Sequence, residues 1–324
     1  MITDEDAETV LVTAAKKELA YLEQFGSPRL PYERLRREDY NYEKQPPSDH
    51  AKNLRRYLRL APSLVPDDES ENVFCIRHPD LSDSNLIVST DSGEDLKIIS
   101  IVDWQHAVVL PLFLFAGMPD FVQNEEDEVS RSMVTPKLPD DFDKLSEDKR
   151  EWQTELLRRR LVHYHYNLST ATHNRMNHKG FVYPQNAFRR RIFNHAITVW
   201  EGETIKLLYA LIELVANWDV LAKDNIPCPV VIPEDEVAAA EKLYQALMES
   251  DDSARLLQDA IGYGSETWVP AADYERAKAM AQELKRTTLS ASPEDEEMTE
   301  ELYAKMEANW PFDDVDEEEL EEYE

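Results

Sequence analysis

Residues 74–105, FCIRHPDLSDSNLIVSTDSGEDLKIISIVDWQ, constrain the fold most, because they interrupt a chain whose other patterns are mainly helical. FCIR predicts a short apolar strand, and RHPDLSDSN at 77–85 predicts a polar loop. LIVS and LKIISIV are β-branched runs separated by TDSGED, a turn-rich cluster. The segment therefore predicts a β-hairpin embedded in a helical protein.

The sequence on both sides of this hairpin favours helices. Residues 5–25 carry apolar side chains at helical spacing, and Ser48 is a candidate N-cap for a helix that ends at Leu60. Residues 26–47 between them form an irregular, basic segment. From about residue 146 almost every pattern is helical. The expected helices are 145–168, with Trp152, Leu156, Val162 and Tyr166 on one broad face, and 185–197, 200–222, 234–261 and 270–288.

Composition limits the classes of partner. The chain has 324 residues, of which 42% are hydrophobic, so a sizeable core can form. Its formal net charge of −31 repels phosphate backbones and anionic lipid, which argues against nucleic-acid binding and membrane-surface binding. The longest apolar run, VVLPLFLFAGM at 108–118, is too short to span a bilayer.

The N-terminus and the cysteines bear on the compartment. MITDEDAETV is acidic and resembles neither a secretory signal nor an arginine-rich mitochondrial presequence. Cys75 and Cys228 give no disulfide framework, which fits a reducing compartment and two buried thiols.

The predicted hairpin brings two possible metal ligands together. If its turn is centred near Glu94, Asn85 lies nine residues before the centre and Asp103 nine residues after it. Antiparallel pairing then places both side chains at the same end of the hairpin, even if the register slips by a residue or two. An amide oxygen and a carboxylate suit Mg²⁺, which takes oxygen ligands and keeps waters or substrate phosphates in its remaining positions.

The preceding loop supplies two further candidates. Asp80 could orient an acceptor hydroxyl and accept its proton. His78 could hydrogen-bond backbone groups and hold the shape of the loop. Together with Asn85 and Asp103 these residues have the spacing H-x-D-x-x-x-x-N, hairpin, Asp, which is the spacing of a phosphoryl-transfer site in protein kinases.

The motif resembles a particular branch of that superfamily. Asp-Trp-Gln stands where kinases have Asp-Phe-Gly, a variant similar to aminoglycoside phosphotransferases and choline-kinase-like proteins. RHPDLSDSNLIVS and IVDWQHAVVLPLFLFAG look like the fungal phosphotransferase-enzyme family related to altered inheritance of mitochondria protein 9. The resemblance covers roughly residues 7–315, including WPFDD near the end, and is strongest at 71–119.

The resemblance implies a fold and roles for the site residues. The implied fold is α+β and predominantly α: the C-terminal lobe of a protein-kinase-like fold, with a catalytic β-hairpin and a helical extension. Asp80 matches the catalytic Asp, Asn85 and Asp103 match the metal ligands, and His78 matches the structural histidine of the loop. The implied cofactors are Mg²⁺ and ATP, and the implied partner is a small molecule with an acceptor hydroxyl. The resemblance implies a mitochondrial location, although the N-terminus predicts none and otherwise fits the cytoplasm.

One departure from the family leaves two functions open. Family members have a β-rich N-terminal lobe, with a glycine-containing loop and a phosphate-binding lysine, ahead of the matched segment. Neither GxGxxG nor GxxxxGK[ST] occurs in this chain. We therefore expect a phosphotransferase form without its nucleotide lobe, which binds ATP·Mg²⁺ weakly, on the order of millimolar, and has an apolar face beside Asp103 and the first helix. The alternative is a catalytically silent pseudo-enzyme that binds a protein partner through its helical and acidic surfaces.

With this resemblance the chain divides into three segments. Residues 1–47 hold the first helix and the irregular segment, 48–290 the kinase-like lobe with its helical extension, and 291–324 an acidic tail. The block DDVDEEELEEYE within that tail is expected to be disordered.

Other motifs have simpler structural interpretations. His163 and His165 are two residues apart on a helix and do not face each other, so packing or solvation is favoured over metal binding. RRR at 158–160 and at 189–191 could bind an anion, but a solvated helix face is favoured. Trp200-Glu-Gly-Glu is expected to open a helix, and Gln105 and His106 to support the site or lie in the core.

Overall fold

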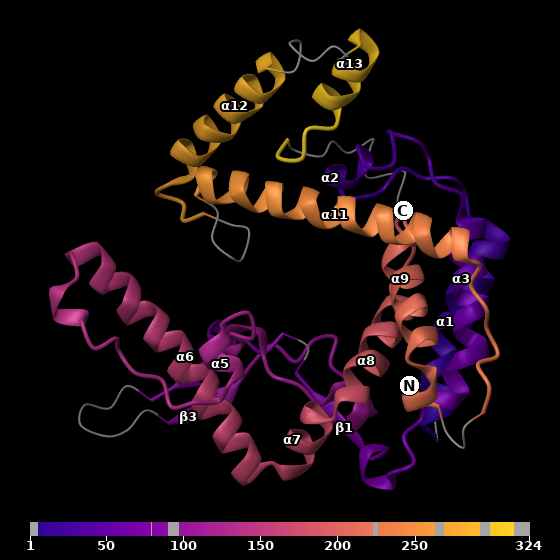
Figure 1. The fold of residues 1–324 in the computed structure, drawn as a ribbon, viewed down its shortest axis with the longest axis horizontal. Helices are drawn as coiled ribbons and strands as arrows, with labels where there is room; N and C mark the ends of the chain where they lie inside the picture. Colours follow the sequence, from indigo (N-terminus) through magenta and orange to yellow (C-terminus); the bar gives the residue numbers. More distant parts are fainter. Residues whose placement is uncertain are drawn as a thin grey trace. The chain divides into compact units, whose positions relative to one another are not determined.

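The structure, a computed structural model, describes residues 6–78, 80–89, 97–222, 226–262, 269–291 and 299–313 (Figure 1). These residues are mostly helical with two small sheets, which confirms the predicted class, α+β and predominantly α. The α-helices are α1 (Ala7–Phe25), α2 (Arg34–Arg37), α3 (Pro47–Leu60), α4 (Leu112–Phe115), α5 (Glu128–Arg131), α6 (Glu147–His173), α7 (Arg175–Val182), α8 (Pro184–Ile197), α9 (Ile205–Ala216), α10 (Trp218–Leu221), α11 (Glu234–Ile261), α12 (Tyr274–Ala291) and α13 (Glu300–Ala308). The strands are β1 (Phe74–Arg77), β2 (Leu86–Val88), β3 (Ile98–Ile101) and β4 (Val108–Pro111).

The residues form two compact units. The hairpin unit comprises 1–11, 63–193 and 220–226, and the helical unit comprises 12–62, 194–219 and 227–324. This division cuts through the predicted segment 48–290. Among the described residues, none of the helices combines the length and the apolar character needed to cross a membrane.

The hairpin unit contains all four strands. β1 pairs antiparallel with β4, and β2 pairs antiparallel with β3. α4 follows β4 directly, and its Leu112, Phe113 and Leu114 are buried. Gly180 lets α7 approach α4 closely, because a Cβ at this position would lie 2.8 Å from the Cβ of Ala116. A small apolar core thus forms where α4 follows β4 and packs against α7.

The helical unit is built on the contact of α9 with α3 and α11 (Figure 1). Its largest fully buried side chains include Leu54 and Tyr57 on α3 and Leu207, Leu211 and Leu214 on α9. A second cluster joins Ile205, Ala240 and Leu247, so apolar residues of α9 and α11 share one core.

Two predicted helix starts are wrong. The second helix begins at Pro47 with Pro46 as its N-cap, so Ser48 is not the cap; proline is favoured in the first turn because its φ is already helical. Trp200-Glu-Gly-Glu does not open a helix, since α9 begins only at Ile205. Gly202 has φ +90°, and a Cβ there would lie 2.2 Å from the carbonyl oxygen of Leu30, so this stretch is a tight turn.

The other predicted ranges agree more closely. α11 has the predicted bounds, and α6 extends the predicted 145–168 by a few residues at its C-terminal end. The predicted helix at 200–222 is shorter and divided into α9 and α10. The predicted disorder of the tail at 314–324 and the turn at 90–95 lie outside the described residues.

Candidate functional site

The predicted hairpin is present as β2 and β3, but its register differs by one residue at the site. Leu86 pairs with Ile101, and the backbone N–H of Val102 donates to the carbonyl of Asn85 at 3.0 Å. Asn85 is therefore opposite Val102 and one residue away from Asp103. The two predicted metal ligands still lie at the same end of the hairpin, as expected.

His78 holds the loop to the end of β3. Its ring is only 5% exposed, and Nε2 lies 2.8 Å from the carbonyl oxygen of Val102. Because a carbonyl can only accept, Nε2 must carry a proton in this contact. Nδ1 is buried and has no hydrogen-bond partner among the described residues. The expected contact of this ring with the backbone is thus present.

Asn85 connects the loop with the hairpin. Its side-chain Nδ2 donates to the backbone carbonyl of Asp80 at 2.8 Å, and its backbone carbonyl accepts from the backbone N–H of Val102. The hydrogen bond fixes the plane of the side-chain amide, and Oδ1 is on the opposite side of that amide from Nδ2. Asn85 can therefore bond the Asp80 backbone and offer Oδ1 to a cation at the same time.

Asp103 has an unusual backbone conformation. Its φ is +62°, in the left-handed region, which aspartate enters more readily than most residues with a Cβ. His106 also has φ +62°, so the chain turns sharply twice between β3 and β4. The Asp103 side chain is exposed, as is that of Asp80. The conformation places a solvent-accessible carboxylate directly after the residue that His78 and Asn85 both bind.

Trp104 covers this junction. Its ring contacts that of His78 edge-on, with centroids 4.9 Å apart, and its Nε1–H donates to the carbonyl of Ile101 at 3.0 Å. Sequence reasoning noted Trp104 only as part of the Asp-Trp-Gln variant. It gave no indication that the indole packs on the predicted loop histidine.

Arg77 is a second residue that sequence reasoning missed. It ends β1, immediately before His78, and donates to the carbonyls of Phe115 and Met118 at 2.6 and 3.2 Å. Its guanidinium therefore joins the start of the loop to the last residue of α4 and to the segment that follows. The only sequence clue is its place beside His78 in RHPD.

The residues present fit a magnesium ion in their chemistry. Mg²⁺ takes oxygen ligands, commonly one or two from protein, and Asn85 Oδ1 and the Asp103 carboxylate are oxygen donors at one end of the hairpin. In the described part of the chain, three or more His, Cys, Asp or Glu side chains do not converge into a cluster that could hold a metal by themselves.

The two histidines of HYHY make contacts of their own, different from those of the predicted metal ligands. His163 is buried, and its Nδ1 accepts from the backbone N–H of Asn124 at 3.1 Å. His165 is exposed and contacts the ring of Tyr164. The expectation that they pack or face solvent is confirmed.

The arginine triplets differ from each other. Arg158 and Arg159 are exposed and both bind Glu155, as expected for a solvated helix face. The expectation is wrong for Arg160, which binds Asp127 at 2.6 Å and is mostly covered, and for the second triplet.

Arg189 shows why the second triplet is not a solvated face. It is buried on α8 and donates to the carbonyl of Leu64 at 2.7 Å, to Asn186 Oδ1 and to the carbonyl of Leu221. Burial lowers the pKa of its guanidinium, and three acceptors satisfy it. This arginine joins distant segments and is not an anion site.

Two minor expectations also change. Gln105 and His106 are exposed, so neither lies in the core. Cys75 and Cys228 are free thiols, but each is only partly buried.

Comparisons with known proteins leave the family open. The chain matches no family model and no solved structure. A subtelomeric hrmA-associated cluster protein of Aspergillus fumigatus, found in two strains, is 29% identical to this chain over 269 residues. The match covers 82% of this chain and 51% of that protein, so the chain spans about half the length of the curated relatives it matches.

Proposed function

We propose that the chain carries the magnesium- and acceptor-binding part of an ATP-dependent phosphotransferase, which acts on a hydroxyl group of a small molecule. The observation that carries this proposal is the position of Asn85, which donates to the Asp80 backbone and accepts from Val102, the residue before Asp103. Through its side-chain amide and its backbone carbonyl, Asn85 thus links the residue predicted to accept the proton with the residue next to the predicted metal ligand.

Each residue has a role in this proposal. Asn85 Oδ1 and the Asp103 carboxylate would hold Mg²⁺, which supplies positive charge to the oxygens of the transferred phosphoryl group. Asp80 orients the acceptor hydroxyl and accepts its proton. His78 positions the loop, because its Nε2–H donates to Val102 and its ring is buried against Trp104.

The proposed fold is the C-terminal lobe of a protein-kinase-like protein. It rests on the order β1, loop with H-x-D-x-x-x-x-N, β2, β3 and Asp103, together with the helices that follow. It also rests on the resemblance to fungal phosphotransferases in the same stretch.

Calorimetric titration of the chain with MgCl₂ tests the metal site. Asp103→Asn keeps the shape of the side chain and removes its charge, so we expect Mg²⁺ affinity to fall by about tenfold or more. Asp80→Asn should leave Mg²⁺ binding nearly unchanged, because Asp80 acts on the acceptor. Asp140→Asn, at an exposed residue of the hairpin unit, is the matched control.

The result decides between the two functions. If Asp103→Asn and Asp140→Asn bind Mg²⁺ like the parent, the metal site is wrong. A chain that binds Mg²⁺ should also bind ATP more tightly with Mg²⁺ than in EDTA, and the Asp103→Asn variant should lose this difference.

The second candidate is a protein-interaction module without catalysis. The observation that favours it is the exposure of apolar side chains on β1, β3 and β4, among them Ile76, Ile98, Ile99, Val108 and Val109. Exposed apolar side chains on strands are the kind of surface that a protein partner covers. An absence of any Mg²⁺ or ATP binding would leave this candidate as the better one.

A further inference from the structure

The helical unit contains a cavity of about 440 Å³ that the proposed phosphoryl transfer does not use. Its walls come from the segment after α2, the N-terminal parts of α3 and α11, the turn at 200–204 and the start of α9. All of these residues belong to one compact unit. A volume of this size is typical of small-molecule sites.

Part of the lining is apolar. Ile205 and Ala240 are buried there and belong to the core cluster that α9 shares with α11. Leu208, Leu243 and Tyr40 pack against that cluster, stay partly exposed and line the same space. A ligand with an apolar body would therefore remove hydrophobic surface from water.

Trp200 adds a polar group to this lining. The residue is only 4% exposed, and its Nε1–H has no acceptor in the described part of the chain. Unlike the indole nitrogen of Trp310, the indole nitrogen of Trp200 is not sealed from solvent. Because Trp200 lines the cavity and is otherwise covered, its N–H is available to whatever occupies the space.

Hydrogen bonds hold Trp200 and the turn after it in place. The backbone N–H of Trp200 donates to Glu18 Oε1 on α1 at 3.0 Å. Thr204 Oγ1 accepts from Asn53 Nδ2 at 3.1 Å and lies 2.9 Å from His50 Nδ1. The indole is therefore fixed before a ligand arrives, which lowers the entropy that binding costs.

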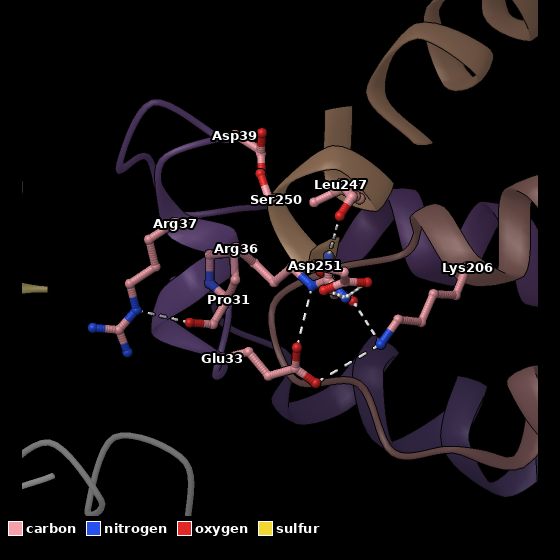
Figure 2. Close-up of polar contacts among 10 residues, drawn as sticks. Pro31, Glu33, Arg36, Arg37, Asp39, Lys206, Leu247, Ser250 and Asp251 are labelled. Atoms are coloured by element: carbon pink, nitrogen blue, oxygen red, sulfur yellow. Dashed lines mark hydrogen bonds and ion pairs between the residues drawn. The ribbon is translucent and has the colours of Figure 1, made fainter. Parts of the chain in front are cut away.

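Buried contacts also hold the segment after α2 on α11. Arg36 is buried and donates to Asp251 at 3.0 Å (Figure 2). The hydroxyl of Ser250 donates to Asp39 at 3.0 Å. Tyr40 follows Asp39 directly, so its place in the lining is fixed by contacts with the same helix.

The charged groups of the lining disfavour an anion. Asp49, Asp235 and Glu236 contribute three carboxylates, and Lys52 contributes one ammonium group. Lys52 and Arg56 both bind Glu236, at 3.0 and 2.6 Å, so the lysine is already paired. A carboxylate ligand would therefore lose hydration and meet the further carboxylates of Asp49 and Asp235.

The indole N–H selects among uncharged ligands. Water can accept from this donor while the cavity holds only solvent. A purely apolar molecule that displaces this water leaves the donor unpaired, which costs affinity. A neutral carbonyl oxygen restores the hydrogen bond without bringing a charge into the cavity.

We propose that this cavity binds a small neutral molecule with an apolar body and a carbonyl oxygen, such as a carboxamide. The oxygen accepts from Trp200 Nε1–H, and the apolar body packs on Leu208, Leu243 and Tyr40. The site consists of helical-unit residues alone and does not depend on the proposed phosphotransferase activity.

Titration followed by NMR at about 150 mM salt tests the proposal with three probes of similar shape. Benzamide carries a ring and a neutral carbonyl, benzoate replaces the amide by a carboxylate, and toluene has no acceptor. The chain has 6 tryptophans, so ¹⁵N labelling of tryptophan gives few indole signals. The signal that disappears in Trp200→Phe is that of Trp200.

We expect benzamide to bind with a Kd of about 1 mM or tighter and to move the indole proton of Trp200 downfield. Benzoate should not bind measurably. Absence of saturable benzamide binding at about 10 mM, or equal binding of benzamide and benzoate, would overturn the proposal. Binding that leaves the Trp200 signal unmoved would overturn it as well.

Two variants and a matched control locate the site by ligand-observed NMR, which does not need the Trp200 signal. Trp200→Phe keeps a ring and removes the donor, so benzamide should bind several-fold more weakly and toluene equally or more tightly. Ala239→Phe fills the cavity from an exposed position of its lining and should abolish benzamide binding. Ala238→Phe, the same change at the neighbouring exposed residue of α11 outside the lining, should change affinity by less than about twofold.

The variants also give contrary outcomes. Equal weakening of benzamide and toluene by Trp200→Phe would show that the indole acts by its shape and would overturn the hydrogen bond. Equal effects of Ala239→Phe and Ala238→Phe would overturn the location. If Trp200→Phe proves unfolded by circular dichroism, the two alanine variants and the comparison of benzamide with benzoate still decide the matter, because neither needs Trp200 to be changed.

Discussion

The left-handed backbone at Asp103 predicts an inverted order of stability for two substitutions. Asp103→Ala keeps a Cβ at φ +62° without the polar side chain that eases this conformation, which costs about 1–2 kcal/mol for an ordinary L-residue. Asp103→Gly avoids this cost, but glycine gives the unfolded chain more freedom, worth about 0.4–1 kcal/mol. The difference leaves the glycine variant more stable than the alanine variant by about 0.5–1 kcal/mol.

Urea unfolding at 25 °C in EDTA measures this difference without any contribution from a bound cation. Glu241 provides the control pair, because it lies exposed within α11, where alanine is favoured over glycine by about 1 kcal/mol. At Asp103 the glycine variant should thus be more stable than the alanine variant, and at Glu241 the alanine variant should be more stable than the glycine variant. The same order at both positions, alanine above glycine, would refute the assigned conformation of Asp103. Both Asp103 variants should also lose any stabilisation by Mg²⁺.

Three further predictions concern stability. The ion pair with Arg160 lowers the pKa of Asp127 from 3.8 to about 2, so Arg160→Gln should lower the free energy of unfolding by about 1 kcal/mol above pH 4. Acid unfolding curves should show the stabilities of parent and variant converging as the pH falls towards 2. Gly180→Ala should cost about 1–3 kcal/mol in urea unfolding, because its Cβ would lie 2.8 Å from that of Ala116; no loss would mean that α7 can move away from α4. Leu211→Ala, at a fully buried position on α9, should cost about 2–5 kcal/mol, and a smaller loss would mean that the core collapses around it.

Local patterns predicted the parts of the fold that local interactions determine. The bounds of α11 follow from a long apolar periodicity that ends at Gly262, which has φ +92° and is the left-handed residue that terminates the helix. The hairpin followed from two β-branched runs around a polar cluster. The observed register at Asn85 differs by one residue from a turn centred on Glu94, within the slip that the prediction allowed. Next to the turn, Val88 pairs with Ile98, which is two residues from that register, and the irregularity between Ile87 and Val88 removes one of the two.

Long-range contacts account for what the sequence did not reveal. Arg189 is buried because its acceptors, the carbonyls of Leu64 and Leu221, come from residues 125 and 32 positions away. Nothing in the RRR pattern distinguishes it from the exposed Arg158. The contact between Trp104 and His78 has the same origin, since it depends on how β3 returns to the loop.

The exposure of β3 leads to a last prediction about the site. Ile98 and Ile99 are 61% and 67% exposed, although successive residues of a strand point to opposite faces. Neither face of β3 is therefore covered by the described residues, and a two-stranded ribbon without cover is only marginally stable in water. The backbone amides of β3 should exchange with deuterium much faster than those of the buried helix α9. A cation held by Asn85 and Asp103 would join the ends of β2 and β3, so saturating Mg²⁺ should slow exchange in β3 and leave α9 unchanged. Protection of β3 equal to that of α9 without Mg²⁺, at every protein concentration, would show that the ribbon is not the weakly held element described above.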